Sequence, residues 1–456
     1  MGSDPPTKTV LQESRRSAGR RARRTPGLLV AHTAAPPKDQ PDRWSLRGTC
    51  VVGRRPPADF VVADPRLSQQ HFRLTSQGGR HEIEDLDSTN GTMLDGTRLE
   101  PGRPVELADR CVIRGGETVF IFLPDASQVF DAGVDAGSAN LPMAGRFHLP
   151  PLLRDLMEAA LSHRAPLLAG PSGVGKEHAA EVLASLWSLQ PPRRYNVAAA
   201  ANPEEMSRAL FGVAGKAFTG VSEQAGMIVT SAKQNRPLFL DEVHNLSPEA
   251  QATLLTVLED GRFSRKGAEA EEVRVDVRFV FASNAPDRLK HDLRARLWRL
   301  DIPSLRDRVA DVPDIFRHLL LRQLDRHGIE PQPVVHALDA DVAHDLCLEA
   351  LRGSAFVESN VRGLADVADR IAARIAAGSE PTDAVDTVFA ERLSLRAKAS
   401  QSCGSHYEQH RELITAVYLG CGKNAKKTVD LLRSAGLPWS ISRRHLTLNV
   451  QRWGLK

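Results

Sequence analysis

The pattern of apolar and polar positions changes character along the 456-residue chain. Between residues 28 and 124, short β-branched and aromatic runs alternate with turn residues, which predicts an all-β sandwich. From 141 to 377, helical periods alternate with short apolar strands, which predicts a parallel sheet covered by helices. Residues 405–456 carry helical periods only. The clearest strands are expected at 50–52, 60–62, 72–74, 81–83, 119–122, 167–169, 238–240 and 277–281.

Polar segments separate these units. Residues 1–27 are predicted to be a disordered basic tail, and residues 125–140 and 378–404 to be linkers. With 41% hydrophobic and 25% charged residues, the composition is that of a soluble globular protein. No apolar run approaches the roughly 20 residues of a membrane helix, and no signal core is seen, so we expect a cytoplasmic protein without membrane contact. The cysteines have no metal-ligand spacing: Cys50, Cys111, Cys347, Cys403 and Cys421.

Positive charge is concentrated at the two ends. Basic side chains outnumber acidic ones by seven to two in residues 1–27 and by nine to three in residues 405–456, although the whole chain has a net charge of only +4. Such ends favour contact with a polyanion. For the arginine-rich stretch 15–24, a solvated tail is the simpler interpretation.

A phosphate-binding loop follows the strand expected at 167–169. Its residues from Gly170 to Lys176 have the spacing G-x-x-x-x-G-K, in which backbone N–H groups surround phosphates and the lysine neutralises their charge. Asp241 and Glu242 end the strand expected at 238–240. Carboxylates at that edge of a parallel sheet face such a loop, although an acidic helix cap is the alternative interpretation.

Between these motifs stand Leu210-Phe211-Gly212 and the run Lys-Ala-Phe-Thr-Gly-Val at 216–221. This order resembles the central domain of sigma-54-dependent enhancer-binding activators, a branch of the AAA+ ATPases whose signature loop is GAFTGA. Four of the six loop positions match. The resemblance implies that Phe218 and Thr219 contact sigma-54 RNA polymerase.

The same resemblance implies ATP and Mg²⁺ as cofactors and assigns further roles by position. Asp241 would hold the metal and Glu242 would polarise the attacking water. Asn284 would sense the γ-phosphate, and Arg296 would complete the site of a neighbouring subunit, with Lys290 in place of a second such arginine. A homo-oligomeric ring, a hexamer, is therefore expected. The implied nucleotide-binding residues are Gly170, Ser172, Gly173, Gly175, Lys176, Glu177 (where other P-loops have Ser or Thr) and Arg362.

Two regions depart from the family pattern. Lys216 and Val221 replace small residues at the ends of the signature loop. The family's Asn-Cys-Ala-Ala segment appears as Val-Ala-Ala-Ala-Ala at 197–201. Its asparagine, which links the γ-phosphate to the loop, is not aligned, although Asn196 is close.

Three fragments of the first domain resemble a forkhead-associated (FHA) domain: Gly53-Arg54, Ser-Gln-Gln-His at 68–71, and Asp-Leu-Asp-Ser-Thr-Asn-Gly-Thr at 85–92. The resemblance implies recognition of a threonine-phosphorylated protein. A phosphate dianion needs a charged donor and fixed hydrogen-bond donors on loops. The implied phosphate ligands are Arg54 and Ser68, the peptide-backbone ligands are Thr89 and Asn90, and His71 would brace the loops. A sandwich kept only for packing is the alternative.

The C-terminal helices, expected from Glu412, from Asn424 and from Ser442, resemble the Fis-type helix-turn-helix that binds double-stranded DNA. The third helix would face the major groove while Leu446 and Val450 face the core. A small dimerisation bundle with a solvated basic face is the alternative. The implied DNA-binding residues are Arg443, Arg444, His445 and Asn449.

The sequence therefore predicts a multidomain protein: an all-β FHA sandwich, an α/β AAA+ P-loop domain with a small helical lid, and an all-α helix-turn-helix. The implied function is a bacterial sigma-54-dependent regulator that hydrolyses ATP under phosphothreonine control, in a logic like two-component signalling. One alternative is a degenerate regulator that binds nucleotide, DNA and phosphoprotein without remodelling polymerase. Another is an ATP-driven remodeller of a different protein.

Overall fold

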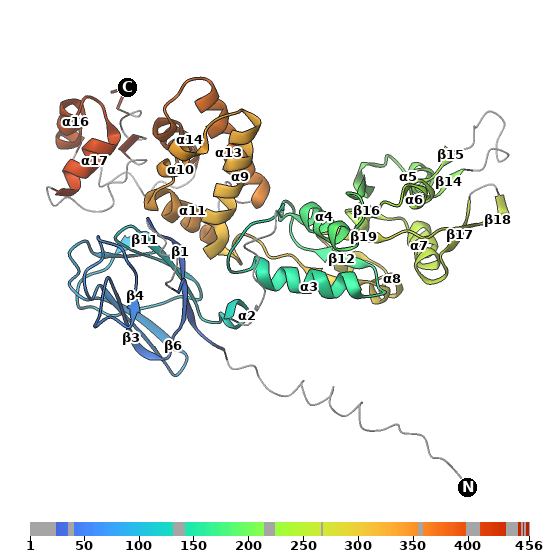
Figure 1. Cartoon of the computed structure of the whole chain (residues 1–456), viewed down its shortest axis with the longest axis horizontal. Helices are drawn as coiled ribbons and strands as arrows, with labels where there is room; N and C mark the ends of the chain where they lie inside the picture. Colours follow the sequence, from blue (N-terminus) through green and yellow to red (C-terminus); the bar gives the residue numbers. More distant parts are fainter. Residues whose placement is uncertain are drawn as a thin grey trace, which may run out of the picture.

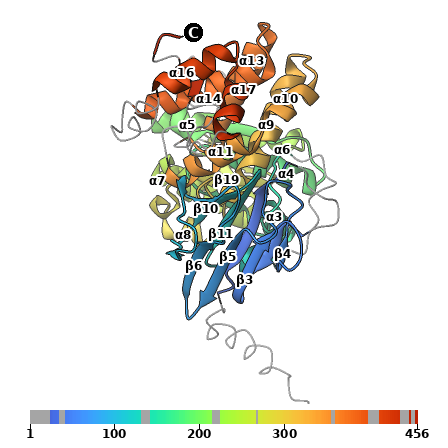
Figure 2. The ribbon, with the colours of Figure 1, turned by 90° about the vertical axis from the view of Figure 1, so that its left-hand side faces the viewer.

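A computed structural model of the chain describes an N-terminal β-sandwich, a central α/β domain, a helical lid and a C-terminal helical unit (Figure 1). Figures 1 and 2 place the sandwich directly beside the lid, although the two are far apart in sequence. Among the described residues, no helix has the length and apolar character needed to cross a membrane. The described residues are 24–34, 41–130, 142–213, 224–265, 268–353, 359–397, 411–434, 446–447, 450 and 453–455.

The N-terminal domain is a sandwich of two sheets, as its strand spacing predicts. One sheet has the order β2-β1-β11-β10-β7-β8 and the other β4-β3-β5-β6-β9. Phe72, Phe120 and Phe122 belong to the core between them. The strands are β1 (Gly27–His32), β2 (Arg43–Ser45), β3 (Gly48–Gly53), β4 (Phe60–Val61), β5 (Phe72–Gln77), β6 (Arg80–Asp85), β7 (Thr92–Leu94), β8 (Thr97–Arg98), β9 (Val105–Glu106), β10 (Cys111–Gly115) and β11 (Thr118–Leu123).

The central domain is built on five parallel strands in the order β13-β16-β19-β12-β20. Helices α3 and α4 cover one face, and α5 to α8 cover the other. The strand predicted at 277–281 begins at Phe279 and continues to Ser283. The strands of the domain are β12 (Pro166–Ala169), β13 (Arg193–Asn196), β14 (Gly212–Val213), β15 (Gln224–Ala225), β16 (Leu238–Asp241), β17 (Arg262–Arg265), β18 (Ala268–Arg274), β19 (Phe279–Ser283) and β20 (Trp298–Asp301).

Two helices of the central domain begin at side-chain caps. Asn202 and Ser247 cap α5 and α7 by accepting a backbone N–H of the first turn, and proline follows each cap. The helices are α3 (Leu149–Leu161), α4 (Lys176–Leu186), α5 (Pro203–Phe211), α6 (Met227–Lys233), α7 (Pro248–Asp260) and α8 (His291–Arg296), with 3₁₀ turns η2 (Val197–Ala199), η3 (Val243–Asn245), η4 (Pro286–Arg288) and η5 (Val309–Asp311).

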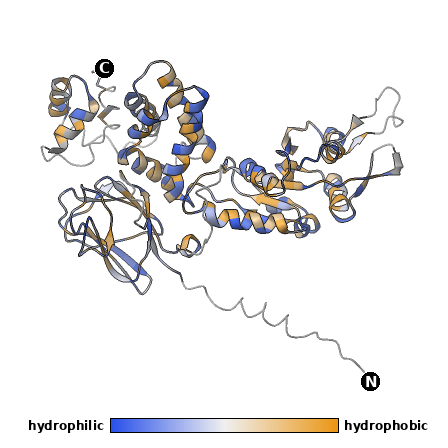
Figure 3. Cartoon of the chain, in the orientation of Figure 1, coloured by the Kyte–Doolittle hydropathy of each residue, from blue (hydrophilic) through white to orange (hydrophobic). Residues whose placement is uncertain are grey.

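The lid is a bundle of helices that alternate apolar and hydrophilic residues (Figure 3). Its core includes Phe316, Leu346 and Ile371, each almost fully buried. Asp339 caps α11 through the backbone N–H of Val342. The helices are α9 (Val312–Arg326), α10 (Pro331–Ala337), α11 (Ala340–Arg352), α13 (Val361–Ala376) and α14 (Pro381–Ala397).

The linker predicted at 378–404 is wrong over most of its length. Helix α14 occupies Pro381–Ala397, and Val385 and Phe389 lie in the lid core, the latter with its ring edge-on to Phe316. The helix is buried on several sides, so its apolar residues form no single stripe. In the first predicted linker, α2 (Ser127–Phe130) is helical. The predictions for residues 1–23, 131–140 and 398–404 lie outside the described residues.

The C-terminal unit contains α16 (Arg411–Gly420) and α17 (Ala425–Ser434), where two of the three helices are predicted. Asn424 caps α17 by accepting the backbone N–H of Lys427. Leu446 and Val450 are fully buried against Ile414 and its neighbours, which confirms that these two positions face the core.

Candidate functional site

The P-loop joins β12 to α4, as its spacing predicts, and holds Lys176 in a partly enclosed position. The side chain is 7% exposed, and its Nζ donates to the carbonyl oxygens of Gly170 and Pro171 at 2.8 and 3.0 Å. Gly173 has a positive φ of 75° and lies so close to the lid that an added Cβ would be 2.0 Å from the Ser359 carbonyl oxygen. Glycine is therefore required at this position.

Asp241 and Glu242 lie at the carboxyl end of β16. One strand, β19, separates β16 from β12, the strand that leads into the P-loop. The backbone N–H of Glu242 donates to the Asp241 carboxylate at 2.9 Å. Glu242 has a left-handed backbone, with φ 53° and ψ 41°, which non-glycine residues adopt at a cost. Its Oε2 is buried and accepts no hydrogen bond from the described residues. A buried acceptor on a strained residue suits a group that polarises a water molecule.

The charges of this site influence one another. Burial lowers the pKa of Lys176, and the nearby positive charge of Arg362 acts in the same direction, while Asp241 and Glu242 oppose it. Burial raises the pKa of Asp241, and the charge of Glu242 adds to this effect. These four charges therefore act on one another as one cluster of two cations and two carboxylates. Lys176 lies on α4, Asp241 and Glu242 at the end of β16, and Arg362 on α13.

Asn284 follows β19 and reaches the same cluster. Its Nδ2 donates to Oε1 of Glu242 at 3.3 Å. His244 lies on the other side of Glu242, with Nδ1 3.3 Å from the second carboxylate oxygen and 3.1 Å from Ser283 Oγ. Asn284 therefore holds the orientation of the Glu242 carboxylate.

Two residues without a predicted role connect the P-loop to the lid. Asn360 is 7% exposed and donates from Nδ2 to the Ser172 carbonyl at 2.9 Å, while its Oδ1 accepts the backbone N–H of Leu305. Its φ of 51° with ψ −131° is rare for a residue with a side chain. Buried Arg308 donates to the Val174 carbonyl at 2.8 Å. The only sequence signal near Asn360 was Arg362, two residues later, to which the family resemblance assigned a role.

Two of the predicted site residues are engaged elsewhere. Glu177 forms an ion pair of 2.6 Å with Arg194 of β13. Arg296, at the end of α8, pairs with Glu259 at 2.7 Å and has 61% of its side chain exposed. Glu177 nevertheless lies close enough to Asp241 for its charge to raise the pKa of that carboxyl, whereas the structure does not bring Arg296 into the cluster around Lys176. Exposure of Arg296 is compatible with a role toward a second subunit, and that role stays a prediction.

The strand register shows where the asparagine nearest to the segment 197–201 lies. Asn196 is the last residue of β13 and is the direct register partner of Asp241 on β16. An asparagine thus stands at the strand end beside the acidic pair. Its Oδ1 accepts the backbone N–H of Ala198 at 2.9 Å.

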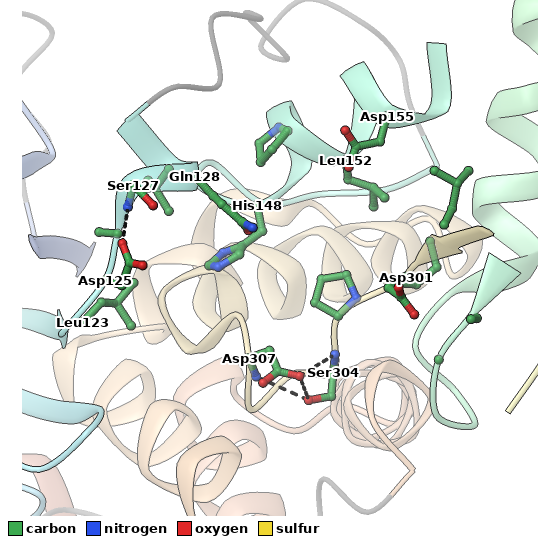
Figure 4. A pocket seen from close by; sticks show the side chains of 18 of the residues that line it. Leu123, Asp125, Ser127, Gln128, His148, Leu152, Asp155, Asp301, Ser304 and Asp307 are labelled. Atoms are coloured by element: carbon green, nitrogen blue, oxygen red, sulfur yellow. Dashed lines mark hydrogen bonds between the residues drawn. The ribbon is translucent and has the colours of Figure 1, made fainter. Parts of the chain in front are cut away.

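A cavity of about 950 Å³ lies next to the P-loop, between the end of the sandwich and the central domain (Figure 4). It touches the loop only at Gly170 and Pro171, so it is not the place of the Lys176 cluster. Figure 4 shows Asp125 and Ser127 on one side, and Ser304 hydrogen-bonded to Asp307 on the other. The cavity is thus walled by both domains.

The predicted phosphopeptide residues converge on neighbouring loops of the sandwich. Ser68 Oγ accepts the backbone N–H of Thr89 at 3.0 Å, and the backbone N–H of Arg54 donates to the Ser68 carbonyl. Asn90 donates from Nδ2 to the Arg66 carbonyl at 2.6 Å. Arg54 and Thr89 are exposed. An exposed cation and an exposed hydroxyl therefore lie beside the half-buried Ser68 and Asn90 on neighbouring loops, which is a set of side chains suited to a phosphorylated peptide.

His71 braces these loops from within, as predicted. It is fully buried, and its Nδ1 accepts the backbone N–H of Ser68 at 3.0 Å, so its Nε2 donates to the Gly91 carbonyl at 3.3 Å. Burial lowers the pKa of this imidazole, which favours the neutral form that the geometry requires. Asp85, a brace that the sequence analysis did not single out, accepts from both Ser88 and Thr92.

Some predicted site residues lie outside the described residues, so the structure does not test them. They are the sigma-54 contacts Phe218 and Thr219, the flanking Lys216 and Val221, and the DNA contacts Arg443, Arg444, His445 and Asn449.

Comparisons with known proteins identify two domains. Residues 148–303 match the family described as the sigma-54 interaction domain, and residues 50–116 match the FHA domain.

Relatives of the central domain are transcriptional regulators. The chain is 38% identical over 183 residues to the transcriptional regulatory protein XylR of Pseudomonas putida, which is 38% of this chain and 32% of the relative. It is 31% identical over 245 residues to the DNA-binding transcriptional regulator NtrC of a Bradyrhizobium species, which is 51% and 48%. It thus spans a third to a half of these relatives. With the transcriptional regulatory protein GlrR of Escherichia coli, identity is 29% over 325 residues, 64% of this chain and 70% of the relative.

Proposed function

We propose that this chain, which matches the sigma-54 interaction domain over residues 148–303 and the FHA domain over residues 50–116, hydrolyses ATP to remodel sigma-54 RNA polymerase under phosphothreonine control. The observation that carries this proposal is the cluster of Lys176, Asp241, Glu242 and Arg362 at the end of the parallel sheet. Two cations beside two carboxylates suit a polyphosphate with a divalent metal.

The residues present fit ATP and Mg²⁺. Backbone N–H groups from Gly170 to Lys176 would surround the phosphates, with Lys176 and Arg362 supplying positive charge. Asp241 would hold Mg²⁺, which neutralises phosphate charge when bound. Glu242, whose buried Oε2 lacks a hydrogen-bond partner among the described residues, would orient the attacking water, and Asn284 would keep its carboxylate in place.

The FHA domain would bind a threonine-phosphorylated protein. Arg54 would supply a charge-assisted hydrogen bond to the phosphate and Ser68 a hydroxyl. Thr89 and Asn90 would bind the peptide backbone. The close packing of these loops around His71 supports this role, because the donors are held before the ligand arrives.

Assembly and DNA binding complete the proposal. Exposed Arg296 would enter the nucleotide site of a neighbouring subunit in a ring, so hydrolysis would depend on protein concentration. The C-terminal unit would hold the ring at double-stranded DNA, and both DNA and polymerase are found in the bacterial cytoplasm. The buried pair Leu446 and Val450 supports an inward face for the third helix.

Transcription from a sigma-54 promoter tests the proposal most directly. We expect ATP-dependent open complexes with the wild-type chain and none with Thr219→Ala, whereas ATPase activity should survive this substitution. Equal transcription by both proteins would remove the loop from the mechanism. ATPase activity without open complexes would favour a different protein target.

A degenerate regulator is the second candidate, favoured by Lys216 and Val221 in the signature loop. It predicts nucleotide binding without turnover at any protein concentration. The position of Asn196 beside Asp241 speaks against it, because the strand end retains an asparagine. ATPase activity that rises with concentration would exclude the degenerate version.

A further inference from the structure

Strands β1, β10 and β11 of the FHA domain are buried on both faces, and their outer face packs on the lid. Side chains of a strand alternate between faces. On β1 and β11, Leu28 and Phe120 point into the sandwich, whereas Leu29 and Ile121 join the core that contains the lid residues. Strand β1 contacts α9, α11 and η5, and β11 contacts α11 and η5. One hydrophobic core therefore runs from the FHA domain into the lid, as the adjacent positions in Figures 1 and 2 illustrate.

A buried ion pair connects the two domains within this apolar contact. Arg114 of β10 pairs with Asp341 of α11, and the side chains are only 5% and 9% exposed. Removing one partner from such a pair leaves an uncompensated buried charge and is strongly destabilising. The pair therefore fixes which surface of the sandwich meets the lid.

Two arginines, exposed Arg352 and half-buried Arg110, continue the contact at its rim. Arg352 of α11 donates to the Asp95 carbonyl at 2.8 Å. Arg110, just before β10, pairs with Asp307 at 3.2 Å. The rim contacts thus tie the FHA domain both to the lid and to the loop that precedes it.

Hydrogen bonds link this contact to the phosphopeptide loops. Asp64 accepts the backbone N–H of Arg66 at 2.8 Å and that of Glu117 at 2.7 Å. The Arg66 side chain lies 3.4 Å from the Glu117 carboxylate, and the Arg66 carbonyl accepts from Asn90. Glu117 lies in the turn after β10, close enough to Arg114 for the two charges to interact. The loop that carries Ser68 is therefore joined to the interface through one short turn.

The other end of the contact reaches the nucleotide site. Asp307, the partner of Arg110, is followed by Arg308, which donates to the P-loop carbonyl of Val174. Asn360 at the start of α13 bonds Ser172 of the same loop. The lid also carries Arg362, whose charge lowers the pKa of Lys176.

We propose that the FHA domain and the lid form one body, joined by the Arg114–Asp341 pair, through which phosphothreonine binding and nucleotide binding change each other's affinity. The inference rests on the proposed function of both sites. Coupling between two binding sites is reciprocal, so each ligand must change the affinity for the other by the same factor.

Two titrations measure this factor. A phosphothreonine peptide, selected by the wild-type chain from a degenerate library, is titrated with and without saturating ADP. A fluorescent ADP analogue is then titrated with and without the peptide. We expect the two Kd ratios to agree and to be about fivefold or more.

Variants at the contact locate the coupling. Arg110→Ala with Arg352→Ala removes one half-buried and one exposed side chain at the rim and should leave the fold intact. Arg114→Met with Asp341→Leu replaces the buried pair by apolar residues, which avoids an unpaired charge. In both double variants each ligand should still bind, and the ratio should fall toward one. The matched controls, Arg103→Ala on the FHA domain and Arg326→Ala on the lid, should keep the wild-type ratio.

The outcomes separate the inference from the proposed function. If both ligands bind and the wild-type ratio is one, the coupling is wrong and the proposed function stands. An unchanged ratio in both double variants would also overturn the coupling through this contact. If no phosphothreonine peptide binds at all, the proposed role of the FHA domain and the coupling fail together.

Discussion

The two ligand sites distribute burial in opposite ways. In the FHA domain, the buried residues are braces, His71 and Asp85, while Arg54 and Thr89 remain exposed. In the nucleotide site, the acting group itself is enclosed: Lys176 is buried and has a lowered pKa. Unfavourable backbone angles also occur at Glu242, the residue proposed to act on water.

This difference matches the difference in chemistry. A recognition site benefits from donors that are fixed beforehand and remain in contact with solvent, because less ordering is needed on binding. A hydrolytic site needs groups whose charge and position respond to the ligand, and burial makes each charge more influential. The comparison predicts large effects of single atoms at the nucleotide site and smaller effects at the FHA loops.

The largest effect is expected for Glu242→Gln. This change keeps the shape and removes the carboxylate, so ATP turnover at high protein concentration should fall by about 100-fold or more. Nucleotide affinity should change only a few-fold. Glu249→Gln on the surface of α7 is the matched control, and its turnover should equal wild type. Equal loss in both variants would contradict the role of Glu242.

Arg54→Ala tests the FHA site, whose ligand-binding side chain is exposed. Loss of a charge-assisted hydrogen bond of roughly 1.5–3 kcal/mol should weaken phosphothreonine peptide binding by about tenfold or more. Thermal stability should stay constant because the side chain is exposed. Calorimetric titration would measure the affinity, with Arg80→Ala on the far hairpin as control. An unchanged Kd in Arg54→Ala would show that the phosphate binds elsewhere.

Acidification should weaken the contact between sandwich and lid through His32. Burial, the main cause, lowers the pKa of His32 to about 4 from the ordinary 6.5. The unfolded chain therefore binds the proton first, and the free energy of unfolding decreases as pH falls from 6.5 toward 4. The loss at pH 5 is about 2 kcal/mol.

Urea unfolding at pH 7.5 and 5.0 would measure this loss. His32→Gln should be less sensitive to the change in pH than wild type. His336→Gln, at an exposed histidine, should behave as wild type. An equal pH dependence in all three proteins would argue against a His32 that stays neutral in the folded chain.

The smallest effect concerns the backbone of Asn360. Asn360→Ala and Asn360→Gly lose the same two hydrogen bonds, but only glycine adopts the observed positive φ without strain. The glycine variant should therefore be the more stable of the two by about 1 kcal/mol. Thermal melting of both variants gives the comparison, and an identical melting temperature would mean that the backbone angle carries no cost.

Local sequence patterns predicted the helices with one apolar stripe and the short apolar strands. The runs at 167–169 and 238–240 are strands of the central sheet, and the paired motifs Lys176 and Asp241 meet at its carboxyl edge. Their positions follow from period and spacing alone, because the C-terminal ends of parallel strands share one edge.

Long-range features were beyond those patterns. Helix α14 was missed because it is buried on several sides and shows no single apolar stripe. The role of Asn360 depends on a contact with Ser172, 188 residues earlier. The burial of β11 on both faces had a signal, since residues 119–123 are all apolar where an antiparallel sheet with one wet face would alternate. The sequence could not name the lid as the partner on that face.

The two carbonyl bonds of Lys176 have a consequence for which ligands the P-loop accepts. Its ammonium donates two of its three N–H bonds to Gly170 and Pro171, so a ligand that takes more than the third must replace a backbone acceptor. A neutral or singly charged molecule offers little advantage in that exchange, whereas a polyphosphate does. The P-loop carbonyls therefore compete with the ligand for Lys176, and the loop selects ligands by their charge density before any contact with the base is made.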